Sequence, residues 1–215
     1  NTPVGPTPTS TQTATATATA TATNTPLPPT NTPTATATSP GPITSAYFNP
    51  SANAAVTSSA GDNNGFQSNP ANAYADGGGL AVDTNSGTTT STSCTDAGKD
   101  KHVYYNYTIS LPGATAIDGI EVRLDGLADR IAGAPRFCVQ LSWDGGTSWT
   151  TAKQTGTLTT SQATYLLGGA ADNWGRTWAV GELANTGFRV RISMVASNTA
   201  RDFSLDWVAV RVTYR

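Results

Sequence analysis

The first 42 residues constrain the fold of this chain more than any other feature. They contain 16 Thr and 9 Pro and no charged side chain, and a strict Thr-Ala alternation runs from Thr13 to Thr23. Such a tract buries too little apolar area to offset the entropy of ordering it, so it cannot form a core of its own. The sequence therefore predicts two parts: an extended low-complexity arm over 1–42 and one folded domain over 43–215.

The arm itself allows two structures. Prolines fix φ and remove backbone donors, which predicts a flexible or polyproline-like stalk. Residues 9–25 contain no proline, however, and Thr recurs there at every odd position, which is the period of a β-strand. A strand with a Thr face and an Ala face could dock on a neighbouring subunit.

A row of Thr between prolines is also the composition of an O-glycosylated stalk. Docking and glycosylation are compatible, because they would use opposite faces. The glycosylation candidates are Thr11, Thr13, Thr15, Thr17, Thr19, Thr21, Thr23, Thr25, Thr32, Thr34, Thr36 and Thr38.

Beyond the arm, short segments of alternating apolar and polar residues are separated by Gly, Asn, Asp and Ser. This pattern predicts an all-β fold. The strongest predicted strands are 102–111, 117–127, 136–143, 188–194 and 205–214, and weaker ones are 43–48, 79–82, 149–153 and 163–167. We expect a single jelly-roll-like β-sandwich, with an immunoglobulin-like sandwich as the alternative.

Charge and hydropathy restrict the classes of partner that this chain can bind. The formal net charge is −2, and Asp62 is the first charged side chain, so no basic patch is evident for nucleic acid or for an anionic membrane surface. No apolar run is long enough to span a bilayer. The chain starts at Asn1 without a charged or apolar leader, which we expect of a mature secreted product, located outside the cell or on its surface.

Two cysteines, Cys94 and Cys138, are expected to form a disulfide in such an extracellular chain. With a single histidine, His102, the sequence offers no Cys/His metal site. Residues 62–65 read Asp-Asn-Asn-Gly, and residues 76–79 read Asp-Gly-Gly-Gly. We expect solvated turns there, with calcium as an alternative, and no other cofactor.

One short motif lies in the second half of the chain. Residues 142–149 read S-W-D-G-G-T-S-W, which resembles the Asp-box of sialidases and other secreted β proteins, S-x-D-x-G-x-x-W. The resemblance implies a folded hairpin turn rather than a catalytic element, with its defining positions at Ser142, Asp144, Gly146 and Trp149. A single copy argues against a sialidase propeller.

Two tryptophans, Trp174 and Trp178, flank Gly175 and Arg176 and are candidates for a sugar-stacking platform. The alternative is that both rings belong to the core.

Catalysis has few candidate residues. One histidine removes most Ser-His-Asp and Cys-His arrangements, and the only glutamates are Glu121 and Glu182. We therefore predict that the protein is not an enzyme.

As a whole, the chain resembles Thr/Pro-stalked surface proteins of environmental bacteria, including subunits of glycosylated extracellular pilus-like fibrils. The resemblance implies a structural fibril subunit whose O-glycosylated arm links copies of the chain into a head-to-tail homopolymer. The alternative is a carbohydrate-binding β-sandwich tethered by a glycosylated linker, with polysaccharide as partner. A fragment of a secreted glycosidase is a third hypothesis.

Overall fold

The computed structural model of the chain describes residues 5–6, 8–10, 12, 14, 16, 41–56 and 65–215. The chain divides into two units, 1–38 and 39–215. All twelve threonines named as glycosylation candidates lie outside the described residues, as does most of the proline-free tract 9–25. Within the described residues, no helix combines the length and apolarity that a membrane crossing needs.

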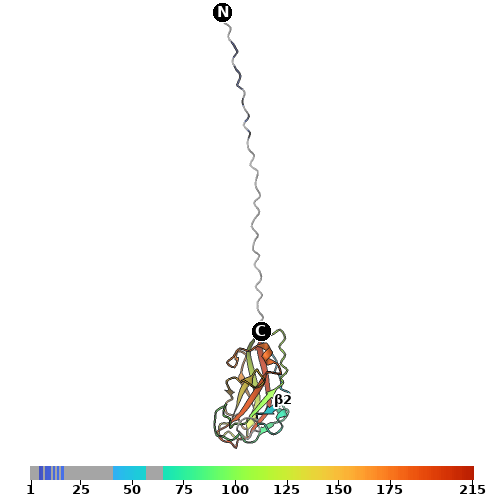
Figure 1. Cartoon of the computed structure of the whole chain (residues 1–215), viewed down its shortest axis with the longest axis vertical. Coiled ribbons are helices and arrows are strands. Elements are labelled where there is room, and N and C mark those ends of the chain that lie inside the picture. Colours follow the sequence, from blue (N-terminus) through green and yellow to red (C-terminus); the bar gives the residue numbers. More distant parts are fainter. Residues whose placement is uncertain are drawn as a thin grey trace. The chain divides into compact units, whose positions relative to one another are not determined.

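The domain is a sandwich of two antiparallel sheets, which confirms the predicted all-β, jelly-roll-like fold (Figure 1). The first sheet has the order β1-β10-β5-β8, and β3 also pairs with β10. Its strands are β1 (Ile43–Thr44), β3 (Ala81–Asp83), β5 (Ile117–Ala128), β8 (Ala163–Gly168) and β10 (Phe203–Tyr214).

The second sheet has the order β2-β4-β9-β6-β7. Its strands are β2 (Ala52–Ala55), β4 (Lys101–Tyr105), β6 (Arg136–Ser142), β7 (Lys153–Gln154) and β9 (Arg189–Val195). Two short 3₁₀ helices, η1 (Pro70–Tyr74) and η2 (Val180–Leu183), lie between strands.

The core lies between the sheets and follows from strand periodicity. Alternate residues of a strand point to the same face, so an apolar residue at every second position gives each sheet one apolar face. In β5 and β10 these residues pair across the sheet, with Val122 opposite Val210 and Leu124 opposite Val208, and all four are fully buried. Removing these faces from water supplies the main driving force for folding.

Two strands of the second sheet differ from the strands predicted from the sequence. Strand β4 ends at Tyr105 rather than at residue 111, because Asn106 (φ 59°) and Thr108 (φ 51°) adopt left-handed backbone conformations that a strand cannot contain. Strand β2 was not predicted, since its sequence, Ala-Asn-Ala-Ala, has neither branched nor aromatic residues. It forms an edge of the sheet by pairing with β4.

Side chains of β4 alternate between the interior of the sandwich and the outer face of the second sheet. His102 and Tyr104 point into the sandwich and are buried, whereas Val103 and Tyr105 lie on the outer face of the second sheet and are only partly buried. An outward valine and tyrosine side by side give this face an apolar surface that solvent can reach.

Candidate functional site

A pocket of about 460 Å³ opens on the outer face of the second sheet. Strands β2, β4 and β9 and the turn between β6 and β7 contribute to it. The residues that line it are Ala54, Ala55, Val56, Val103, Tyr105, Gly145, Gly146, Trp149, Arg189 and Arg191.

Strand register places the floor of this pocket. Val103 of β4 lies opposite Arg191 of β9, and Tyr105 lies opposite Arg189. On its other side Arg191 lies opposite Gln140 of β6. Arg191 Nη2 donates a hydrogen bond to Gln140 Oε1 (2.6 Å), and Gln140 Nε2 donates to the Thr150 carbonyl oxygen (2.8 Å). Gln140 is therefore fixed at both ends and in turn orients Arg191.

The Asp-box residues form one wall. Ser142 Oγ donates to Asp144 Oδ1 (3.0 Å), and the backbone N–H groups of Gly146 and Ser148 donate to Ser142 Oγ (2.9 Å) and Asp144 Oδ1 (2.8 Å). The Ser148 N–H bond is the main cause that lowers the pKa of Asp144. Trp149 Nε1 donates to the Gly146 carbonyl oxygen (2.9 Å), so the turn holds the indole ring in one orientation at the pocket.

Glycine is needed at the top of this turn. Gly146 has φ 98°, which L side chains rarely adopt, and a Cβ there would lie 3.4 Å from the Trp149 ring and 3.7 Å from the Arg189 side chain. Its lack of a side chain lets the turn approach both residues closely.

Both arginines of the pocket stack on aromatic rings. The guanidinium carbon of Arg191 lies 4.0 Å from the centroid of the Trp149 ring, and that of Arg189 lies 4.4 Å from the Tyr105 ring. Burial lowers the pKa of Arg191 to about 10, so it stays protonated at neutral pH. The pocket therefore combines two aromatic faces with two cationic hydrogen-bond donors.

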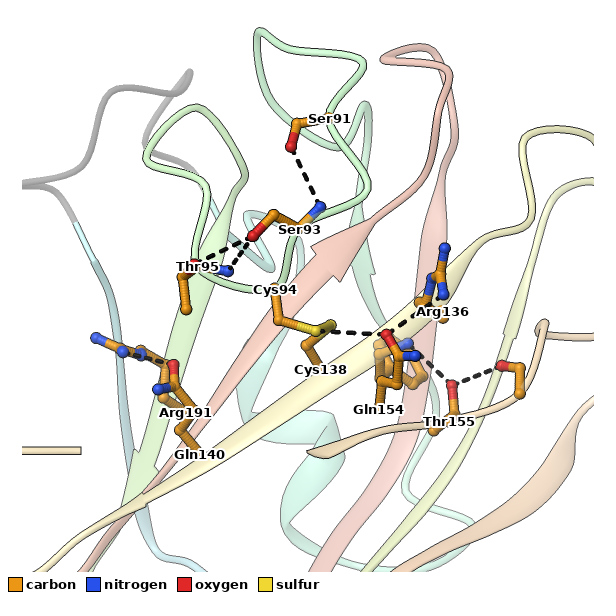
Figure 2. Close-up of a disulfide and its surroundings, with 12 residues drawn as sticks. Ser91, Ser93, Cys94, Thr95, Arg136, Cys138, Gln140, Gln154, Thr155 and Arg191 are labelled. Carbon is orange, nitrogen blue, oxygen red and sulfur yellow. Dashed lines mark hydrogen bonds between the residues drawn. A yellow bond between two sulfur atoms is a disulfide. The ribbon is translucent and has the colours of Figure 1, made fainter. Parts of the chain in front are cut away.

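The predicted disulfide between Cys94 and Cys138 is present, with a Cα–Cα distance of 5.5 Å. It ties the loop before β4 to β6 on the same outer face, two residues from Gln140 (Figure 2). In Figure 2 the Gln140–Arg191 hydrogen bond lies beside this bridge. The disulfide thus anchors the loop close to the strand that orients Arg191.

The prediction of a sugar-stacking platform at Trp174 and Trp178 is wrong. Both rings are buried, each only 3% exposed. Trp174 Nε1 donates to the Ile120 carbonyl oxygen and Trp178 Nε1 to the Asn173 carbonyl oxygen, both at 2.8 Å. Their polar edges are satisfied by the backbone and their faces belong to the core, so neither ring can stack on a ligand.

The two glutamates are engaged in ion pairs. Glu121 accepts a hydrogen bond from the Tyr47 hydroxyl (2.5 Å) and pairs with Arg211 (2.9 Å). Glu182 pairs with Arg176 (2.8 Å), which is the main cause that lowers the pKa of Glu182. Each carboxylate has a structural role in holding its neighbours.

The two candidate calcium stretches are residues 62–65 and 76–79. Residues 62–64 lie outside the described residues. Asp76 of the other stretch is exposed and lies 3.9 Å from Arg123. Within 41–56, 65–215 and the described positions of the arm, no group of three or more His, Cys, Asp or Glu residues is placed to hold a metal ion.

No protein-family model matches this chain, and no curated protein matches its sequence. Several solved structures are similar at low identity. A truncated AlyQ with CBM32 and alginate lyase domains is 12% identical, with a TM-score of 0.38, over 81% of this chain and 35% of that one. The chain thus spans about a third of that protein.

Two further structures cover smaller shares of this chain. The CBM32 of AlyQ in complex with 4,5-unsaturated mannuronic acid is 13% identical, with a TM-score of 0.36, over 77% of this chain and 98% of that one. A xylan-binding module, CBM15, is 15% identical, with a TM-score of 0.34, over 62% and 76%.

Proposed function

We propose that the folded domain is a carbohydrate-binding module of a secreted protein and that the pocket on the outer face of the second sheet is its binding site. The observation that carries this proposal is the pairing of two partly exposed aromatic side chains, Tyr105 and Trp149, with the donors of Arg189 and Arg191 in one pocket.

Sugars need such a mixed surface. Their C–H faces pack on aromatic rings, while their hydroxyl groups need hydrogen-bond partners beside those rings. The pocket volume of about 460 Å³ falls within the range of roughly 300–1,000 Å³ that is usual for small-ligand sites. This size suits a short stretch of a polysaccharide.

The site is also held in place before any ligand arrives. Four hydrogen bonds within 142–149 fix the Trp149 wall, and Gln140 fixes Arg191 on the floor. A preorganised site loses less entropy on binding, so contacts of this size give more affinity than they would on a mobile loop.

The pocket favours the binding module over the fibril subunit that we predicted first. The fibril subunit depends on the arm, most of which lies outside the described residues, so it stays a prediction. In the proposed module, the Thr/Pro arm acts as an O-glycosylated tether outside the cell.

Binding to immobilised polysaccharides tests this proposal. We expect retention of the wild type, and at least a tenfold weaker affinity after Trp149→Ala or Tyr105→Ala, because central aromatic contacts commonly contribute more than about 1.4 kcal/mol. Leu166→Ala is the control, since Leu166 is an exposed apolar side chain (52%) on β8 of the other sheet.

Thermal unfolding should first show that the variants are folded. If folded Trp149→Ala and Tyr105→Ala bind as tightly as the wild type, the pocket is not the site. If the wild type binds none of the polysaccharides tested, including acidic and neutral polymers, the proposed function is wrong.

A further inference from the structure

We propose that the saccharide bound by this pocket is anionic and that Arg189 and Arg191 bind its carboxylate or sulfate groups. This inference rests on the proposed function and adds the chemical class of the ligand.

Within the described part of the chain, these two arginines have no paired carboxylate. Elsewhere in the domain, arginines pair with carboxylates: the partners of Arg123, Arg130, Arg176, Arg201, Arg211 and Arg215 lie within 4.0 Å. Among the described residues, no carboxylate forms such a pair with Arg189 or Arg191. Arg136 has no carboxylate partner either, and its Nη1 donates to Gln154 Oε1 (3.3 Å). Among the described residues, the fold therefore pairs six of its nine arginines with a carboxylate, and the two that line the pocket are not among those six.

Arg191 is partly buried and makes few hydrogen bonds. Among the described residues, its buried Nε has no hydrogen-bond partner, and only Nη2 is engaged, with Gln140. A desolvated cation with an unused donor is unfavourable, and stacking on Trp149 offsets only part of that cost. An anionic group in the pocket would supply the missing negative charge.

A third cation, Lys101, lies close to the two arginines of the pocket. Lys101 lies on the same side of β4 as Val103 and Tyr105, and the positive charge of Arg191 contributes, after burial, to lowering the pKa of Lys101. The carboxylates of Asp96 and Asp100 act on Lys101, and Asp144 is bound within the turn. Lys101 is itself buried and donates to backbone carbonyl oxygens, so Arg189 and Arg191 are the cations that the pocket lining presents.

Guanidinium geometry explains why arginine suits this role. Its planar fork can donate two parallel hydrogen bonds to one carboxylate or sulfate group, and such charge-assisted bonds are stronger than bonds to a neutral hydroxyl. Arg189 and Arg191 are two residues apart on one strand, so their side chains lie on the same face, roughly 7 Å apart at the backbone. Neighbouring acidic groups of one polymer could contact both.

Two matched pairs of polymers test the inference by isothermal titration calorimetry. The first pair is polygalacturonate and its methyl ester, and the second is a sulfated galactan and its desulfated form. We expect the wild type to bind the acidic member of at least one pair about ten- to a hundredfold more tightly than the neutral member. Which pair shows the difference identifies carboxylate or sulfate as the ligand group.

Arginine variants assign the effect to the pocket. Arg189→Gln and Arg191→Gln should each weaken binding of the acidic polymer about tenfold or more, and by a clearly larger factor than they weaken binding of the neutral one, which loses only a hydrogen bond to a hydroxyl group. Arg130→Gln, which removes the same charge from a side chain that is 76% exposed, should have no effect. Arg191→Lys keeps the charge but loses the fork, so it should restore only part of the affinity.

The outcomes separate the two proposals. Equal or tighter binding of the neutral polymers, still weakened by Trp149→Ala, would overturn the anionic ligand and leave the carbohydrate-binding function standing. Preference for acidic polymers that Arg130→Gln reduces as much as Arg189→Gln would also overturn it, since general charge would then explain the binding. Binding of no polymer would overturn the proposed function itself.

Discussion

His102 makes the stability of this domain depend on pH. It lies on β4, is only 2% exposed, and points into the sandwich. Its Nδ1 accepts a hydrogen bond from the Phe66 backbone N–H (3.2 Å), and its Nε2 lies 2.9 Å from Asn53 Oδ1. Because an amide oxygen can only accept, Nε2 carries the proton. Both ring nitrogens are thus committed to the neutral form.

Protonation would place a second N–H on Nδ1, facing the Phe66 N–H. Burial lowers the pKa of His102 to about 4, from an ordinary value of 6.5. Because the folded-state pKa is below the unfolded one, the unfolded chain binds the proton first as pH falls. The contribution of neutral His102 to stability is therefore complete above pH 6.5 and is lost as pH falls toward 4.

The interval between the two pKa values sets the magnitude. At about 1.4 kcal/mol for each pH unit, the loss is about 3 kcal/mol, a large share of the roughly 5–15 kcal/mol by which a domain is stable. This chain contains one histidine, so no other imidazole contributes in this range. Carboxylates titrate at its lower end and must be subtracted.

Urea unfolding of the wild type and of His102→Gln, between about pH 4 and 7.5, measures the effect. Glutamine cannot titrate, so carboxylate contributions cancel in the difference between the two proteins. We expect the wild type to lose about 3 kcal/mol more than the variant across this range. NMR titration of the single imidazole reports the folded-state pKa directly. A flat difference curve, or a folded-state pKa near 6.5, would refute this account of the buried imidazole.

Two further predictions concern the elements that shape the pocket. Cys94 and Cys138 are 44 residues apart, so replacing both by Ser should lower the free energy of unfolding by about 4 kcal/mol, measured by urea unfolding against the oxidised wild type under non-reducing conditions; equal stability would contradict this value. Asp144→Ala removes the acceptor that closes the Asp-box turn, so we expect a loss of about 1–2 kcal/mol in thermal unfolding together with weaker polysaccharide binding. Unchanged binding would mean that the turn does not hold Trp149 in position.

Long strands could be predicted from the sequence because their patterns are long. Strands β5 and β10 each run for 12 residues, and their alternation of apolar and polar residues fixes both their extent and their inward face. Strand β2 could not be predicted, since it is four small or polar residues that become a strand only by pairing with β4. Strand β2 thus depends on tertiary pairing with β4 and not on the strand preference of its own residues.

In the pocket, too, local features could be predicted from the sequence and contacts between distant segments could not. The Asp-box motif marked the turn of residues 142–149, because its bonds join near neighbours in the sequence. That Trp149 stacks on Arg191 could not be inferred, because β9 lies between β4 and β6 in the sheet but follows both in the chain. Trp174 and Trp178 misled the prediction for the opposite reason, since aromatic content alone does not distinguish a core ring from a surface ring.

The outer face of the first sheet shows what distinguishes a binding site from a structural cluster of the same composition. There Arg123 stacks on Trp207 at 4.5 Å, close to Tyr47, much as Arg191 stacks on Trp149. Arg123, however, donates to both oxygens of Asp125, at 3.1 and 2.8 Å.

The charge in that cluster is neutralised within the fold, so an anionic ligand would have to displace a carboxylate that is already in place. Arginine beside an aromatic ring is thus common to both outer faces of this sandwich and does not mark a site by itself. The distinguishing property of the pocket is that its guanidinium groups have stacking partners but, among the described residues, no paired carboxylate. A ligand that brings its own negative charge gains there what the Arg123–Asp125 pair already supplies on the opposite face.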